Sequence, residues 1–254
     1  MIPLTPLFSR YRDSYFLFTF RYMDLIRSSP SKELALILSK ELTYLYHIAC
    51  LITYKDIQEQ EIDQLREWLL SLPQTMTLEQ MKTEFSNKME QLNLRAPQPK
   101  NYAYTFTTIW DSIHFLCLLI DDMVESREKY DNELIRQHLR LMKPVFYNVF
   151  FKLNCPMCRN HYLTIKGYLI MQVERIEVAL YREKYGEKIV MVDEMRATDA
   201  TENVLMRHGM LYASMMFHNH VNDYRWIQRN VQPPVQQNTQ RMDWTTYKNL
   251  LQLK

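Results

Sequence analysis

The chain has 254 residues with a net charge of +2, and 47% of them are hydrophobic. This composition excludes an intrinsically disordered chain and does not have the strongly basic balance of a typical nucleic-acid-binding protein. Only three residues are glycine, where average usage of about 7% would give roughly eighteen. Hairpin-rich sheets, dinucleotide-binding loops and P-loops all depend on glycine, so an all-helical fold is predicted.

Targeting and membrane signals are not evident in the sequence. Arg10, Arg12 and Asp13 interrupt the apolar N-terminal segment, which also lacks a leading basic region. The longest apolar stretch, residues 114–120, ends at Asp121 and is far shorter than a membrane span. The expected location is therefore the cytosol or nucleus, with no membrane span and no nucleic-acid partner.

Helix signals divide the first half into four segments. Ser29 and Pro30 resemble an N-cap and a first-turn proline, and Thr77 with Gln80 has the spacing of a capping box. The expected helices cover residues 11–27, 30–54, 56–70 and 77–93. Pro97 and Pro99 mark residues 95–100 as a linker. We therefore expect a helical domain at 1–96, with a degenerate bundle as the hypothesis for its fold, and a second domain at 97–254.

The second half repeats this organisation. Pro144 predicts a kink or break in one helix, and Gly186 is suited to a C-terminal cap. Residues 188–202 have a mixed composition and are expected to form a loop. The expected helices cover residues 103–126, 132–151, 155–185, 203–228 and 243–251. Four long helices are enough for a bundle.

The most reactive motif is Cys155-Pro156-Met157-Cys158, which follows Asn154 at a predicted helix start. Free N–H groups and the helix dipole stabilise a thiolate there, and two cysteines at this spacing can form a readily exchanged disulfide. The alternatives are half of a metal site or two unpaired core cysteines. The motif alone favours redox chemistry over metal binding by roughly two to one.

Two further patterns bring aromatic and polar groups together. Trp110 and His114 share one helical face, although a core aromatic residue beside a buried histidine gives the same pattern. His218, Asn222 and Arg225 share a face within a segment rich in aromatic residues. Such a mixture suits a planar ligand that carries phosphates, but an exposed polar helix end would look similar.

Together, the three motifs resemble the FAD-linked sulfhydryl oxidases of the Erv/ALR type. The order Trp-x-x-x-His, Cys-x-x-Cys-x-x-His and His-Asn-x-Val-Asn agrees over residues 103–229. The additional helical half and the lack of a shuttle tail are most similar to the baculovirus member of this family. Unlike most members, the chain has Phe106-Thr107 in place of Gly-Arg, no tryptophan just before His218-Asn219, and no cysteine beyond Arg229.

The resemblance implies a four-helix bundle with a short fifth helix that holds FAD. Cys155 and Cys158 would be the catalytic residues, and Arg225 or Arg229 would contact the phosphates. The other implied cofactor contacts are Trp110, His114, His161, His218, Val221, Asn222 and Tyr224. No metal would be required.

The implied reaction oxidises protein thiols to disulfides and reduces O2 to H2O2. A substrate thiolate would attack Cys155 and release Cys158, which would face the flavin. The enzyme would form disulfides in viral proteins, in the cytoplasm and nucleus of an infected cell, with packaging into virions as a further expectation. Its 17 Tyr, 11 Phe and 16 Met residues favour a non-covalent homodimer, which is common in this family.

Two alternatives differ in class from the oxidase. A structural zinc module could use Cys155, Cys158 and His161, with His218 or His220 as the fourth ligand. Zinc would not account for Trp110, Asn222 or Tyr224. A helical interaction protein could instead use the aromatic surfaces to bind partners.

Overall fold

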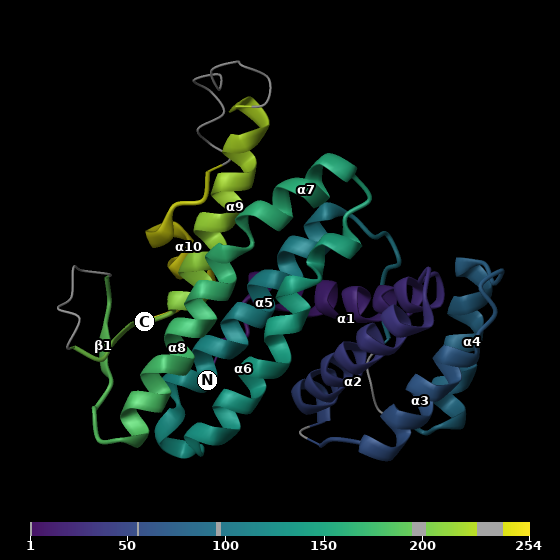
Figure 1. The fold of residues 1–254 in the computed structure, drawn as a ribbon, viewed down its shortest axis with the longest axis horizontal. Helices are drawn as coiled ribbons and strands as arrows, with labels where there is room; N and C mark the ends of the chain where they lie inside the picture. Colours follow the sequence, from purple (N-terminus) through teal and green to yellow (C-terminus); the bar gives the residue numbers. More distant parts are fainter. Residues whose placement is uncertain (1, 55, 95–97, 195–201, 228–240) are drawn as a thin grey trace. The chain divides into compact units, whose positions relative to one another are not determined.

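The structure is a computed structural model that describes residues 2–54, 56–94, 98–194, 202–227 and 241–254, with the side chains of 54 and 225–227 outside the description. It is predominantly helical (Figure 1). The chain divides into two compact units, one formed by Arg12–Ser112 and the other by Met1–Tyr11 together with Ile113–Lys254. Helices α1 (Pro6–Arg27) and α5 (Phe106–Glu125) each contribute to both units. The domains expected at 1–96 and 97–254 stay a prediction.

The unit formed by Arg12–Ser112 contains most of α1, then α2 (Lys32–Tyr54), α3 (Glu59–Ser71) and α4 (Leu78–Gln91). Its core includes Phe20 and Phe85, whose ring centroids lie 5.1 Å apart. The predicted capping box is present, because Thr77 accepts from the Gln80 N–H and the Gln80 side chain accepts from the Thr77 N–H.

The α2 start differs from the prediction. Ser31, not Ser29, caps the helix, since its hydroxyl accepts from the Leu34 N–H at 3.1 Å. The segment Lys32–Thr53 is long and apolar enough to cross a membrane, but 56% of its apolar window is buried inside the protein. A buried core helix has the same composition.

The second unit contains the remaining helices (Figure 1). They are α6 (Asn132–Tyr147), α7 (Pro156–Ile165), α8 (Gly167–Lys184), α9 (Gly209–Ile227), α10 (Trp244–Leu251) and the 3₁₀ turns Arg127–Lys129 and Val149–Lys152. Helix α8 packs between α6 and α9. Helix α5 joins α9 through Asp121, whose carboxylate accepts the N–H groups of Met210 and Leu211 at 3.0 and 2.8 Å.

Four details of this unit differ from the sequence prediction. The helix expected over 155–185 is divided in two at Lys166, and Pro144 lies inside α6 without ending it. Residues 188–202 were expected to form a loop, but β1 (Val190–Val192) pairs in parallel with β2 (Val204–Met206). Helix α9 therefore begins at Gly209 instead of 203. Gly186 does end α8, with φ of 95°.

Candidate functional site

The paired cysteines lie at the start of α7. Cys155 is the N-cap residue and Pro156 is the first residue of the helix. The Cys155 sulfur accepts from the Cys158 N–H at 3.2 Å, as the side chain of an N-cap residue does. Both residues are half-buried free thiols. The prediction that both cysteines lie at a helix start is confirmed, and their redox role stays a prediction.

The two thiols differ in acidity. Hydrogen bonds from the Cys158 side chain and backbone lower the pKa of Cys155, and Arg159 adds a smaller favourable charge. Burial raises the pKa of Cys158 to about 11. The thiolate of the reduced pair therefore resides on Cys155, while Cys158 holds the proton.

Two hydrogen bonds to backbone carbonyl groups fix the orientation of α7. The Tyr162 hydroxyl donates to the Phe146 carbonyl at the end of α6. Arg159 Nε donates to the Leu153 carbonyl just before the cysteines. These two hydrogen bonds tie α7 to the residues that precede the cysteine pair. They restrict the movement of the pair, which suits a site that must present one sulfur atom in a fixed position.

His161 connects α7 to α9. Its ring stacks on Tyr224 with a centroid distance of 3.5 Å and an interplanar angle of 12°. His220 lies 5.5 Å from His161, and Tyr168 lies 5.6 Å from His220. Burial lowers the pKa of His161, and the nearby His220 lowers it further. The predicted active-site helix and the predicted flavin segment therefore meet at these rings.

His114 and His218 form a second group between α5 and α9. His114 Nε2 lies 3.1 Å from His218 Nδ1, and His114 Nδ1 lies 2.8 Å from the Ser214 hydroxyl. Tyr11 and Tyr247 flank His114 at centroid distances of 5.6 Å, and their hydroxyls lie 2.9 Å apart. Burial lowers the pKa of His114 and brings that of His218 to about 4, so both rings are neutral at pH 7.

The remaining residues predicted to contact the cofactor lie in different parts of the chain. Val221 and Asn222 are half-buried on α9, next to Tyr224 in the sequence. Trp110 lies one turn before His114 on α5, in the part of that helix that belongs to the other unit. The side chain of Arg225, like the whole of Arg229, lies outside the described residues.

The donors and rings in this unit fit FAD. His161 Nε2 and Trp244 Nε1 are buried and have no hydrogen-bond partner among the described residues. An unpaired buried polar atom is costly unless a ligand or water completes it. The flavin and adenine rings of FAD provide both heteroatoms and flat faces. Bound FAD would therefore supply hydrogen-bond partners for these two nitrogens and stack on the neighbouring aromatic rings.

Several residues in these groups were missed by the sequence prediction. Ser214, Tyr11 and Tyr247 surround His114 although they are remote from it in sequence. Asn219 pairs with both backbone groups of Met242, at 2.9 and 2.8 Å, and so fixes the approach to α10. The only sequence signal was the position of Asn219 inside the His-Asn-x-Val-Asn segment.

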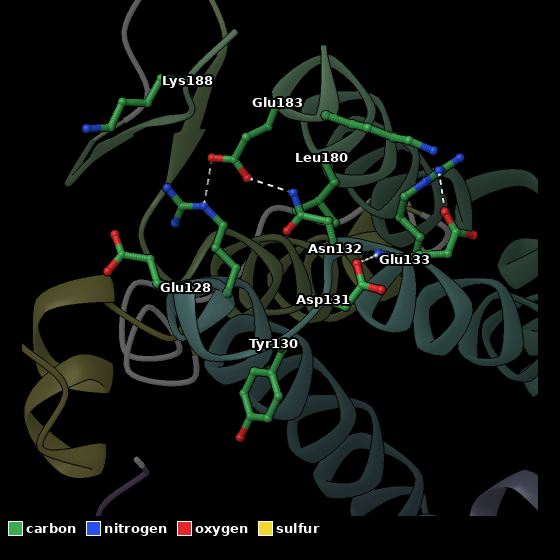
Figure 2. A pocket seen from close by; sticks show the side chains of 11 residues that line it. Glu128, Tyr130, Asp131, Asn132, Glu133, Leu180, Glu183 and Lys188 are labelled. Atoms are coloured by element: carbon green, nitrogen blue, oxygen red, sulfur yellow. Dashed lines mark hydrogen bonds and ion pairs between the residues drawn. The ribbon is translucent and has the colours of Figure 1, made fainter. Parts of the chain in front are cut away.

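A pocket of about 650 Å³ lies elsewhere in this unit (Figure 2). Four basic and four acidic side chains line it, and none is a predicted site residue. The Glu183 carboxylate accepts hydrogen bonds from Arg127 and Asn132, and Arg136 forms an ion pair with Glu133. These pairs leave the lining without a dominant charge, so it does not form a phosphate site.

The zinc alternative is not supported. Across the described ranges, no group of three or more His, Cys, Asp or Glu side chains is arranged to hold a metal ion. His161 instead stacks on Tyr224, and His218 is engaged with His114.

The chain matches a known family and known proteins along nearly its whole length. The Baculovirus P33 family matches residues 5–253. A relative named FAD-linked sulfhydryl oxidase, from Autographa californica nuclear polyhedrosis virus, is 52% identical over 261 residues and covers all of both chains. The 33 kDa early protein of Orgyia pseudotsugata multicapsid polyhedrosis virus is 50% identical, again over the full length of both. The chain belongs to the Baculovirus P33 family.

Proposed function

We propose that Cys155 and Cys158 are the redox pair of this chain, which is an FAD-linked sulfhydryl oxidase. Its substrates are thiols and O2. One observation carries the assignment of the pair: His161, three residues after Cys158, stacks on Tyr224 of α9. This contact brings the cysteine-bearing helix to the segment whose residues resemble the flavin-binding segment of such oxidases.

The chain's own residues account for the thiol exchange. A substrate thiolate attacks the Cys155 sulfur, the Cys155–Cys158 bond breaks, and the electron pair leaves on Cys158. A second substrate thiolate attacks the substrate sulfur of this mixed disulfide and releases Cys155 as a thiolate. Attack at Cys155 is favoured by access, because burial has its larger effect on Cys158.

The released thiolates differ in stability. The Cys158 N–H and side chain stabilise the Cys155 thiolate, whereas burial makes the Cys158 thiolate the more reactive anion. Bound FAD would supply the acceptor for the two electrons, and their transfer to O2 with two protons would give H2O2. In this proposal the cofactor is held by the rings of His114, His161, His218 and Tyr224. The further proposed contacts are Trp110, Val221, Asn222, Arg225 and Arg229.

Three wider proposals follow from the resemblance and the relatives. The substrates are viral proteins that receive disulfide bonds. The enzyme acts in the cytoplasm and nucleus of the infected cell and is packaged into virions. It forms a non-covalent homodimer. Fractionation of infected cells, followed by a thiol-oxidation assay on each fraction, tests the location.

Oxygen consumption with an added dithiol tests the redox pair. Cys155→Ala and Cys158→Ala should each abolish turnover, because a single thiolate cannot both accept and deliver the electrons. Both variants should remain yellow. Cys50→Ala is the matched control, since Cys50 is a buried free thiol in the other unit. Turnover in either variant at the level of this control would refute the assignment.

A further inference from the structure

Ser214 lies where its hydroxyl can determine which ring nitrogen carries the proton in two histidines. Its hydroxyl lies 2.7 Å from the Leu211 carbonyl oxygen and 2.8 Å from His114 Nδ1. A carbonyl oxygen only accepts, so the single hydroxyl proton of Ser214 is directed to Leu211. Ser214 must then accept from His114, which places a proton on His114 Nδ1.

The proton order continues into His218. A neutral imidazole has one protonated and one unprotonated nitrogen. With its proton on Nδ1, His114 presents the lone pair of Nε2 to His218 Nδ1, 3.1 Å away. Two facing lone pairs would repel, so His218 Nδ1 must carry a proton. His218 Nε2 then carries the lone pair of that ring.

Burial keeps this order intact. His114 is almost fully buried, and the pKa of each histidine lies below 6.5 because burial disfavours the charged ring. The nearby His218 and Arg10 further disfavour charge on His114. Neither ring therefore takes up a second proton at neutral pH, and each keeps one protonated and one unprotonated nitrogen.

We propose that Ser214 is a positioning residue that sets the tautomers of His114 and His218, so that both neutral rings carry their proton on Nδ1 when they hold FAD. Only the last step of this inference rests on the proposed function. Ser214 itself does not touch the cofactor in this scheme. Its effect passes through His114, so it should act on FAD affinity and on histidine tautomers without entering the thiol exchange.

Histidine tautomers can be measured directly in the full-length chain. With ¹⁵N-labelled histidine, two-bond proton–nitrogen spectra should show His114 and His218 both protonated on Nδ1, with and without FAD. A wild-type spectrum with the His114 proton on Nε2 would overturn the inference. If the chain took up no FAD, the proposed function would fail, but the FAD-free spectra would still decide the tautomers.

A variant pair separates positioning from packing. Ser214→Ala should mix the tautomers and weaken FAD binding about tenfold, because a buried donor loses its partner. Ser214→Thr keeps the hydroxyl and should restore the wild-type spectrum. The matched control is Ser112→Ala on α5, where a buried hydroxyl donates only to the Thr108 carbonyl. Equal tautomers and equal FAD affinity in Ser214→Ala and Ser112→Ala would contradict the proposal.

Discussion

At the residue scale, the chemistry depends on short motifs that can be recognised and on distant partners that cannot. The position of Cys155 and Cys158 at a helix start could be predicted, because capping and first-turn signals are local in the sequence. The stacking of His161 on Tyr224 and the contact of Ser214 with His114 join residues 63 and 100 positions apart. No sequence spacing encodes such contacts, since they arise only when helices pack.

The acidity difference between the thiols predicts selective alkylation. Because its hydrogen bonds lower the pKa of Cys155, that thiol should be a thiolate at lower pH than an ordinary cysteine. Cys158, with its pKa raised to about 11, should react only at higher pH. Mass spectrometry of the reduced chain after brief iodoacetamide treatment at pH 7 should find the label on Cys155. Predominant labelling of Cys158 would reverse the proposed roles.

The histidine group predicts a link between cofactor and stability. His218→Asp should lower FAD occupancy and the melting temperature, because FAD that binds only the folded state stabilises it by about 2.7 kcal/mol at a hundredfold excess over Kd. His47→Ala, in the other unit, serves as the control. Full flavin content and unchanged melting in His218→Asp would remove this residue from the site.

At the element scale, helix existence was easier to predict than helix ends. Periodic apolar residues and the Thr77 capping box identified long helices. The short helix expected over 243–251 is α10, which Asp243 caps by accepting from the Thr246 N–H. The strands Val190–Val192 and Val204–Met206 were missed because each has three residues and is held only by its parallel partner. The division at Lys166 was missed because the amphipathic pattern continues on both sides.

The start of α9 depends on a buried carboxylate from another helix. Asp121 on α5 accepts the N–H groups of both Met210 and Leu211, although burial raises its pKa to about 7. Asp121→Asn should lower the free energy of unfolding by about 1–3 kcal/mol, since an amide leaves one buried N–H without an acceptor. Urea denaturation measures the change, with the neighbouring, less buried Asp122→Asn as control. Equal stability of the two variants would show that this anchor is unimportant.

At the scale of the whole molecule, the proposed homodimer needs an apolar contact surface. Helix α8 exposes Met171 (73% exposed), Val178 and Tyr181, and its C-cap residue Tyr185 is 66% exposed. Met171, Val178 and Tyr185 are separated by seven residues each, so they lie along one side of the helix. Aromatic residues and methionine are enriched in interface cores, which makes this stripe the proposed contact.

Light scattering tests this contact. The wild-type chain should have a mass about twice 30.9 kDa at micromolar concentration, with and without reductant, because no cysteine is assigned to the contact. Val178→Glu should shift the mass toward one chain, whereas Leu250→Glu, an exposed apolar residue of α10, should not. A wild-type mass near one chain would exclude the dimer.

The transfer of electrons from the cysteine pair to the flavin is the central claim, and anaerobic absorbance spectroscopy measures it. Without oxygen, an added dithiol should bleach the oxidised-flavin band of the wild-type chain and of Cys50→Ala at similar rates. Cys155→Ala and Cys158→Ala, loaded with FAD, should remain yellow over the same period. Bleaching of either active-site variant at the wild-type rate would show that electrons reach the flavin without the pair.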